Sequence, residues 1–249
     1  MQEQIWMLLQ RTGDNNWMNE LKVVLSPRLQ GILDFVGASP IKTLADIGTD
    51  HAYLPIVAVQ LGLCDTAIAC DLNPGPLAIA RQNIRDAGLD GKIETRLGDG
   101  LMPLVPGEAD CIVIAGMGGT RIYDIISDGM AQARKAGCLI LQPQHDIVLL
   151  RERLHLAGFE IQDEALVREV VGGKEHFYII ITAQFTGGVF SWTREEYFLG
   201  KILLEKGGEV FSAYVRREIG KINRYVSKLS DKAALDSAME RLDWLKNTL

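Results

Sequence analysis

The chain lacks any apolar segment long enough to cross a membrane. A transmembrane helix needs about 20 consecutive, mostly apolar residues, and no such run occurs among the 249 residues. The first residues, MQEQIWMLLQRTGDNNW, contain an early acidic residue and only a short apolar patch, so they do not fit a secretory signal. We therefore expect a cytoplasmic protein that has no membrane partner.

Cysteine and histidine are also scarce, with four residues of each type. The cysteines are Cys64, Cys70, Cys111 and Cys138. None of them belongs to a C-x-x-C pair and most lie in apolar runs, which is typical of reduced core residues and not of a disulfide framework. The histidines lie far apart in the sequence and have no metal-ligand spacing. We expect no metal site.

Positive charge is in short supply, because 26 Lys and Arg face 32 Asp and Glu and the net charge is −6. Taken alone, this balance argues against a nucleic-acid partner. From Ser191 onward, however, there are eleven basic and nine acidic residues, a net charge of +2, which leaves −8 for the remainder. A basic stripe in this tail has residues spaced 4, 3 and 4 apart: Arg217, Lys221, Arg224 and Lys228. The stripe suits RNA phosphates, and the alternative is an ordinary solvated helix surface.

Three segments can be distinguished along the chain. Residues 1–17 form an N-terminal extension, either a loose helix or an addition from an upstream start codon, since Met18 begins a second plausible start. Residues 18–186 form the main domain, and residues 187–249 form a helical appendage beyond a Thr-Gly-Gly boundary. Ser26 followed by Pro27 fits an N-cap and a first-turn proline, so we expect a helix to begin there.

Strand-like and helical segments alternate in the main domain. The strand-like runs are TLADI, TAIACD, KIETRLG, ADCIVIAG and GCLILQP, with helices expected at 53–61, 76–87, 122–133 and 147–157. This alternation predicts a parallel sheet that is covered on both faces. Two further runs, FEIQDEALVRE and HFYIIITAQF, are separated by glycines and predict an antiparallel hairpin. The expected fold class is α/β, with a seven-stranded, mostly parallel sheet.

The tail contains two apolar seams of the heptad type. The first consists of Val215, Ile219, Ile222, Val226 and Leu229, and the second of Leu235, Ala238, Leu242, Leu245 and Leu249. Ser230 and Asp231 lie between the seams and can cap the second helix. Two short seams joined by a tight turn predict an antiparallel helical hairpin, that is, a short coiled coil.

Polar residues or glycines follow four of the predicted strands. The four segments are Asp46-Ile47-Gly48-Thr49-Asp50, Asp71-Leu72-Asn73, Gly98-Asp99-Gly100 and Ala115-Gly116-Met117-Gly118-Gly119. Ligands bind where the strands of an open parallel sheet end. Asp, Asn and Gly also favour ordinary turns, but four such strand ends in one register indicate a binding site.

The acidic residues at these strand ends indicate which ligand the site binds. Asp71 lies 23 residues after Gly48, a spacing at which a carboxylate accepts hydrogen bonds from ribose hydroxyls. Asp50 and Tyr53 stand where a dinucleotide turn needs glycines, and a carboxylate would repel a pyrophosphate. It would attract an ammonium or sulfonium group, which favours S-adenosyl-L-methionine over NAD. Asp99 can accept a hydrogen bond from an adenine amino group.

The motifs ADIGTDHAYLP, CDLNPGPLAIARQNI, RLGDGL, IAGMGG and LILQP occur in this order. Together with LSPRL near the start and EHFYIII near the end, they resemble the bacterial tRNA (adenine-22-N1)-methyltransferases. The resemblance covers residues 19–249. It implies a Rossmann-like class I methyltransferase domain that uses S-adenosyl-L-methionine. It also implies tRNA as the partner and 1-methyladenosine, at position 22, as the product.

The resemblance further implies roles for the four strand ends. The turn after the first strand would hold the methionine part, and the acids after the second and third strands would hold the ribose and the adenine. The glycine turn after the fourth strand would line the sulfonium and the target base. The implied cofactor-binding residues are Arg28, Asp46, Gly48, Thr49, Asp50, His51, Asp71, Leu72, Asn73, Asp99, Gly100, Ala115, Gly116 and Met117.

Methylation of the adenine ring nitrogen needs no general base, because N1 has a free lone pair. Positioning then supplies most of the rate, and a nearby carboxylate can stabilise the developing charge. We expect Asp50, Met117 and Gly118 at the reacting atoms. The alternatives are that Asp50 only binds the ammonium group or caps a helix, and that His51 is an ordinary turn residue. Three roles are open for Arg28: it approaches the methionine carboxylate, it approaches an RNA phosphate, or it is merely solvated.

Two other function classes stay open at this point. A class I methyltransferase acting on a small molecule or a protein is compatible with the negative net charge. A non-catalytic tRNA-binding module would have the fold without the reaction. The AGMGG turn replaces the Asn-Pro-Pro-aromatic motif of many amino-directed adenine methyltransferases, which argues against attack by the exocyclic amine. The sequence does not determine the oligomeric state, and we favour a monomer.

Overall fold

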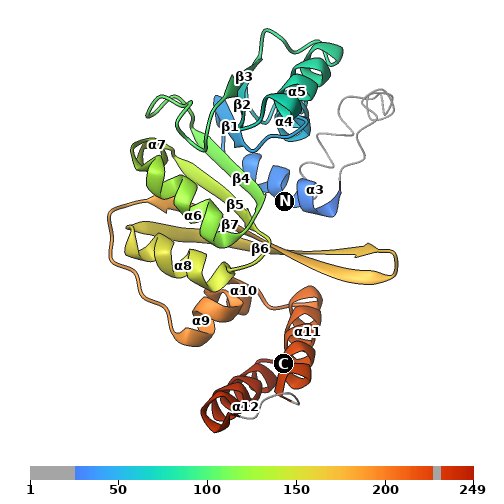
Figure 1. The fold of residues 1–249 in the computed structure, drawn as a ribbon, viewed down its shortest axis with the longest axis vertical. Helices are drawn as coiled ribbons and strands as arrows, with labels where there is room; N and C mark the ends of the chain where they lie inside the picture. The colour runs from blue at the N-terminus through green and yellow to red at the C-terminus, as the bar shows by residue number, and fades with distance from the viewer. Residues whose placement is uncertain (1–25, 227–230) are drawn as a thin grey trace.

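The computed structural model describes residues 26–226 and 231–249 (Figure 1). The N-terminal extension expected at 1–17 lies outside the described residues, and so do Lys228, Leu229 and Ser230. In the part of the chain that the model describes, no helix combines the length and apolar character needed to span a bilayer.

A seven-stranded sheet forms the centre of the molecule, in the order β3-β2-β1-β4-β5-β7-β6. The strands are β1 Thr43–Ile47, β2 Thr66–Asp71, β3 Ile93–Leu97, β4 Cys111–Met117, β5 Cys138–Pro143, β6 Phe159–Val171 and β7 Lys174–Phe185. The first five are parallel, and β7 is antiparallel to both β5 and β6. The predicted α/β class and the predicted terminal hairpin are therefore confirmed.

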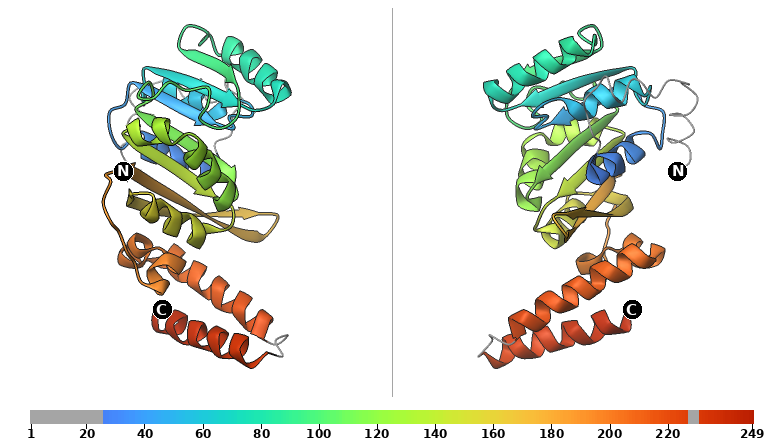
Figure 2. Two further views of the ribbon diagram at one scale, coloured as in Figure 1. Left: turned by 60° about the vertical axis from the view of Figure 1, so that its left-hand side comes forward. Right: turned by 90° about the vertical axis from the view of Figure 1, so that its right-hand side faces the viewer.

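Helices cover both faces of this sheet, as Figure 1 and Figure 2 show. They are α3 Pro27–Val36, α4 Tyr53–Gln60, α5 Pro74–Asp86, α6 Gly119–Asp128, α7 Met130–Lys135 and α8 Ile147–Leu156. One apolar cluster lies beneath α3, α4 and α5, and a second lies beneath α6, α7 and α8. Burial on both faces explains why the central strands read as continuous apolar runs.

A local signal accounts for where α3 begins. Ser26 caps α3 as predicted, and its hydroxyl accepts a hydrogen bond from the amide of Leu29 at 3.3 Å. The single helix expected at 122–133 is wrong. Two helices, α6 and α7, occupy this region, because the backbone at Gly129 (φ −102°, ψ 36°) leaves the helical conformation. Helix α6 also begins at Gly119, three residues earlier than expected.

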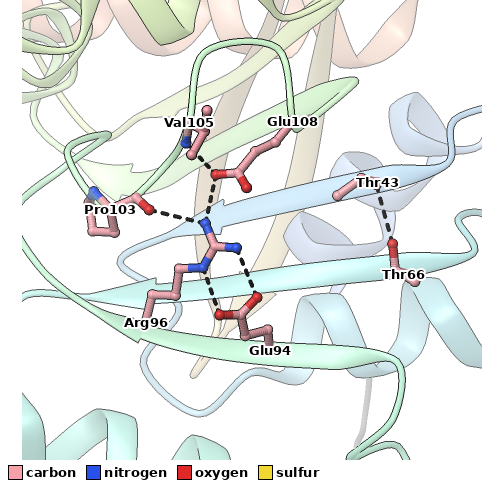
Figure 3. A network of polar contacts seen from close by, with 7 residues as sticks. All are labelled: Thr43, Thr66, Glu94, Arg96, Pro103, Val105 and Glu108. Atoms are coloured by element: carbon pink, nitrogen blue, oxygen red, sulfur yellow. Dashed lines mark hydrogen bonds and ion pairs between the residues drawn. The ribbon is translucent and has the colours of Figure 1, made fainter.

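A polar network holds the long loop after β3 against the edge of the sheet. Figure 3 shows Arg96 between Glu94 and Glu108, with Arg96 Nη1 2.6 Å from Glu108 Oε1 and Nη2 2.8 Å from Glu94 Oε2. The Arg96 guanidinium also donates to the carbonyl of Pro103, and Glu108 accepts from the amide of Val105. The network ties together both ends of the loop that begins with Gly98-Asp99-Gly100.

The tail consists of four helices and not only of the predicted hairpin. They are α9 Arg194–Leu199, α10 Lys201–Lys206, α11 Glu209–Val226 and α12 Lys232–Asn247. Helix α12 returns along α11 towards α9, where the rings of Trp244 and Phe198 lie 5.4 Å apart (Figure 2). Asp231 caps α12 as predicted, since its carboxylate accepts from the amide of Ala234. The description of α11 and α12 as a coiled coil stays a prediction.

A buried ion pair anchors the tail to the sheet. The side chains of Arg151 on α8 and Glu164 on β6 are both fully buried and lie 2.7 Å apart. Arg151 Nη1 also donates to the carbonyls of Tyr197 and Phe198 at the end of α9. Breaking a buried pair of this kind leaves an uncompensated charge and is strongly destabilising. The base of the tail is therefore continuous with the core of the sheet.

Candidate functional site

A cavity of about 410 Å³ opens where the parallel strands β1 and β4 end. Its lining comes from the start of α3, from the turn after β1 and from the end of β4. Seven of the predicted cofactor residues line it: Arg28, Asp46, Gly48, Thr49, Asp50, His51 and Ala115. This is also the point where the order of strands reverses on either side of β1, which is the usual binding position in open α/β sheets.

Asp46 is the buried acid of the cavity and is only 6% exposed. The Thr49 hydroxyl donates a hydrogen bond of 2.7 Å to Asp46 Oδ2. Burial raises the pKa of Asp46 to about 6, and this hydrogen bond opposes the shift while the negative charge of Asp71 adds to it. A cation bound beside Asp46 would stabilise the ionised form of this carboxyl group and so offset the penalty that burial imposes on its charge.

The turn after β1 requires glycine at position 48. Gly48 has φ +73°, and a Cβ atom there would lie 2.4 Å from Cε of Met117. A side chain would therefore be strained and would collide with the end of β4. The amides of Gly48 and Thr49 both donate to the carbonyl of Cys70, which ties this turn to β2.

Asp71 organises the adjoining strand ends. It is 8% exposed, and its carboxylate accepts hydrogen bonds from the amides of Asn73 at 2.8 Å and Asp50 at 3.3 Å. Asp50 itself has φ +52°, an uncommon conformation for a residue other than glycine, and its side chain is exposed. Asp71 thus lies beside the cavity lining and holds the Asp50 turn.

His51 presents a buried nitrogen that lacks a partner among the described residues. Its Nδ1 atom is buried without a hydrogen bond, while Nε2 lies 3.5 Å from the Asp50 carboxylate. The ring of Tyr53 is 5.5 Å away, and the His51 carbonyl accepts from Asn83. A buried polar atom without a partner is uncommon, and its position in the lining is consistent with a ligand contact.

Arg28 reaches the cavity from α3. Its Nη1 atom donates to Gln142 Oε1 at 3.1 Å, and the same oxygen accepts from the amide of Gly116 at 3.2 Å. Its guanidinium also lies over the ring of Tyr178, 5.8 Å from the centroid. Arg28 is thus positioned by β5 and β7 and is not merely solvated.

The glycine turn after β4 contacts a loop that sequence reasoning missed. A Cβ atom on Gly118 would lie 2.3 Å from the ring of His145, and the amide of Gly119 donates to the His145 carbonyl. His145 Nδ1 and Asp146 Oδ2 lie 3.0 Å apart, and this hydrogen bond, with a second from Thr120, lowers the pKa of Asp146. The available signal was the polar end of the fifth strand, Gln142-Pro143-Gln144-His145, at the same sheet edge.

The remaining predicted residues lie at the same sheet edge but outside the lining of this cavity: Asp71, Leu72, Asn73, Asp99, Gly100, Gly116, Met117 and Gly118. Leu72 is 55% exposed. Asp99 forms an exposed ion pair with Arg121, 2.6 Å long. The Asp99 carboxylate must therefore exchange this partner, or share it, to accept a hydrogen bond from a ligand.

The basic stripe on α11 is less uniform than its spacing suggests. The Arg217 guanidinium lies over the ring of Phe177 on β7, 5.4 Å from the centroid. Lys221 donates to the largely buried Glu218 at 2.6 Å. Lys221 and Arg224 have exposed side chains, whereas Arg217 is half-buried against the sheet domain.

Charge and shape together define what the cavity can hold. Within the lining, Asp46 and Asp50 supply negative charge, Arg28 supplies positive charge, and Ala115 presents an apolar surface. A small molecule that contains both a cationic centre and a carboxylate matches this lining. The neighbouring Asp71 suits the hydroxyls of an attached nucleoside.

Comparison with known proteins identifies relatives that cover nearly the whole chain. The chain is 41% identical over 152 residues to a tRNA (adenine(22)-N(1))-methyltransferase of Bacillus subtilis, an alignment that spans 61% of this chain and 62% of that relative. The crystal structure of the B. subtilis m1A22 tRNA methyltransferase is 31% identical, with a TM-score of 0.77, and the match covers 90% of this chain and 98% of that one. The crystal structure of Streptococcus pneumoniae Sp1610 in complex with S-adenosyl-L-methionine is 31% identical, with a TM-score of 0.80. This match covers 91% of this chain and 100% of that one.

The family assignment agrees with this pattern of similarity. A family model described as tRNA (adenine(22)-N(1))-methyltransferase matches residues 44–246. The match includes the four strand ends predicted to bind the ligand, all of α11 and α12 up to residue 246. The chain therefore belongs to the tRNA (adenine(22)-N(1))-methyltransferase family.

Proposed function

We propose that this protein transfers a methyl group from S-adenosyl-L-methionine to N1 of an adenine in tRNA, at position 22. The observation that carries the proposal is the cavity at the ends of β1 and β4, whose lining includes the buried Asp46, the side chain of Arg28 and the turn at Gly48. Membership of the family supplies the substrate class. The negative net charge does not oppose it, because the basic residues of the stripe are concentrated on the tail.

The cavity and the neighbouring strand ends together fit the proposed cofactor group by group. Asp46 and Asp50 match its ammonium and sulfonium centres, and Arg28 matches its carboxylate. Asp71 matches the ribose hydroxyls, and Asp99 matches the adenine amino group once its pairing with Arg121 is exchanged. The unpartnered Nδ1 of His51 supplies a further polar contact in the lining. When bound, the cofactor supplies an electrophilic methyl group.

The chain's own residues contribute position and electrostatics. The turns at Gly48 and Gly118 would bring the backbone of β1 and β4 close to the reacting atoms, and the end of the Met117 side chain lies against Gly48. The Asp50 carboxylate, held by the Asp71 hydrogen bond to its amide, would stabilise the positive charge that develops on the methylated base. No residue has to remove a proton first, so near-attack geometry accounts for most of the rate.

The experiment that tests this proposal is methyl transfer into tRNA followed by nucleoside analysis. Radiolabelled S-adenosyl-L-methionine and unmodified tRNA are expected to yield 1-methyladenosine, because the AGMGG turn lacks the motif used for exocyclic amine attack. Digestion has to avoid alkaline conditions, which rearrange the product. Exocyclic N-methyladenosine at early times would contradict the proposal. Label in protein or small molecules only, or no label at all, would favour the two other function classes.

Cofactor affinity is expected to depend on pH through Asp46. With a pKa of about 6, this carboxylate is roughly 10% ionised at pH 5 and roughly 90% at pH 7. A bound cation favours the ionised form, so affinity should rise about tenfold from pH 5 to pH 7 and then level off. Calorimetric titration with S-adenosylhomocysteine measures this profile. The Asp46→Asn variant should bind more weakly with a flat profile, and an unchanged slope in this variant would exclude Asp46 as the titrating group.

We further propose that residues 187–249 act as the tRNA-binding appendage of a methyltransferase domain formed by residues 18–186. The support is the position of α11, whose Arg217 contacts Phe177 on the same hairpin strand, β7, that carries Tyr178 beside Arg28. Successive strand residues point to opposite faces of a sheet, so Phe177 and Tyr178 lie on opposite faces, and an RNA bound along α11 must pass around the β6–β7 hairpin to reach the cavity. The buried Arg151–Glu164 pair, with the bonds from Arg151 to the carbonyls of Tyr197 and Phe198, attaches the base of the tail to the sheet.

A further inference from the structure

Two of the four cysteines lie side by side at the sheet edge opposite the cofactor cavity. Cys111 begins β4 and Cys138 begins β5, and the two are register partners on these parallel strands. Neighbouring strands are about 4.8 Å apart, which lies within the Cα separation of about 4.4–6.8 Å found in disulfides. Both cysteines are free thiols, and both belong to the apolar cluster on the same face of the sheet.

A hollow makes this pair accessible to small reagents. Its volume is about 680 Å³, and Cys111 and Cys138 both line it. Phe35, Val36 and Ile41 form an apolar wall, and the charged groups that face the hollow are Lys42, Asp110 and Asp163. Cys111 is 2% exposed, whereas Cys138 is half-buried. A reagent in the hollow therefore meets Cys138 first.

The two thiols also differ in acidity in a way that suits two roles. The hydrogen bond from Cys111 lowers the pKa of Cys138. The same hydrogen bond, together with burial, raises the pKa of Cys111. Burial is the largest cause of the raised pKa of Cys64, about 11, and of Cys70, about 12, and nearby charges have smaller effects. Because the thiolate is the reactive form, Cys138 is the expected nucleophile and Cys111 the resolving thiol.

We propose that Cys111 and Cys138 form a redox-sensitive dithiol, a modification site for small hydroperoxides. The Cys138 thiolate attacks a peroxide oxygen, the O–O bond breaks, a sulfenic acid forms, and the leaving oxygen is protonated to water (from hydrogen peroxide) or to an alcohol (from an alkyl hydroperoxide). The Cys111 sulfur then attacks the sulfenic sulfur, a water leaves and the S–S bond forms. With hydrogen peroxide, two thiols yield one disulfide and two waters, and the two electrons lost by sulfur reduce the peroxide. A low-molecular-weight dithiol reverses the step.

The first test compares thiol reactivity in the folded native protein. Brief treatment with N-ethylmaleimide at pH 7.5 is followed by trypsin and mass spectrometry. Cys111 and Cys138 fall on separate peptides, residues 97–121 and 136–151, while Cys64 and Cys70 share residues 43–81. Cys138 is expected to react at least about tenfold faster than Cys64 or Cys70, after allowance for the lower nucleophilicity of a more acidic thiol. Equal rates would overturn the assignment of Cys138 as the nucleophile.

The second test follows oxidation by hydrogen peroxide. The native protein is expected to lose about 2 Da, to cross-link residues 97–121 to residues 136–151, and to recover with dithiothreitol. The Cys111→Ser variant should instead hold a sulfenic acid on Cys138 that dimedone traps, and Cys138→Ser should show no adduct on Cys111. An unchanged mass, a cross-link to the peptide with Cys64 and Cys70, or an adduct on Cys111 in Cys138→Ser would each overturn the proposal.

Discussion

Replacing Asp71 by alanine is expected to weaken S-adenosyl-L-methionine binding by about 1.5–3 kcal/mol, the range for a lost charge-assisted hydrogen bond. This corresponds to a loss of affinity of roughly 10- to 150-fold. Besides its proposed ribose contact, the carboxylate accepts the amide hydrogens of Asn73 and Asp50. Its removal should therefore loosen the Asp50 turn as well as remove a ligand contact.

Calorimetric titration with S-adenosylhomocysteine measures this loss, and circular dichroism checks the fold. Asp71→Asn is the conservative partner variant, since an amide oxygen still accepts from one backbone amide while the charge is lost. Asp65→Ala is the matched control, because Asp65 is an exposed acid just before the other end of the same strand, β2. Unchanged affinity in a folded Asp71→Ala variant would refute the ribose role.

Neutralising the stripe Arg217, Lys221, Arg224 and Lys228 by glutamine is expected to weaken tRNA binding on the order of 100-fold at moderate salt. Each lost phosphate contact should lower the slope of log affinity against log salt by about 1. Glutamine keeps helix propensity, and the apolar seam of α11 is untouched. Affinity for S-adenosylhomocysteine should not change, because the cofactor cavity lies on the sheet domain.

The contacts of the stripe allow its members to be separated. Lys221→Gln with Arg224→Gln should account for about 2 of the slope, and because Lys221 also donates to the largely buried Glu218, the thermal stability of this variant has to be compared with that of the native protein. Arg217→Gln also removes the contact with the Phe177 ring, so its thermal stability has to be compared with that of the native protein. Lys232→Gln with Lys246→Gln on α12 is the matched control for two charges lost elsewhere on the hairpin. Filter-binding salt titrations that show equal slopes for both pairs would exclude this face of α11 as the RNA surface.

The strand ends show how far sequence reasoning reaches in this fold. Asp46, Gly48 and Asp50 could be placed together at the cavity because each lies at or directly after the end of β1, and parallel strands end at one edge. The reasoning failed where a distant segment decides the outcome. His145 was missed because its contact with Gly118 depends on β5 lying beside β4. The long helix expected at 122–133 is interrupted at Gly129. Asp99 was assigned by position alone, without its partner Arg121.

By itself, the sequence determined the alternation of strands and helices, the cap at Ser26, the terminal hairpin and the family. These depend on hydrophobic periodicity and on motifs within about 20 residues of one another. Only the tertiary structure decided which groups meet across the sheet, because these contacts join residues far apart in the chain. Arg28 bonds to Gln142, 114 residues away, and Arg151 meets the carbonyl of Tyr197, 46 residues away. Cys111 and Cys138 become neighbours because β4 and β5 pair in register. Such long-range pairing depends on the order of the strands in the sheet and on burial, and no local sequence pattern encodes that order.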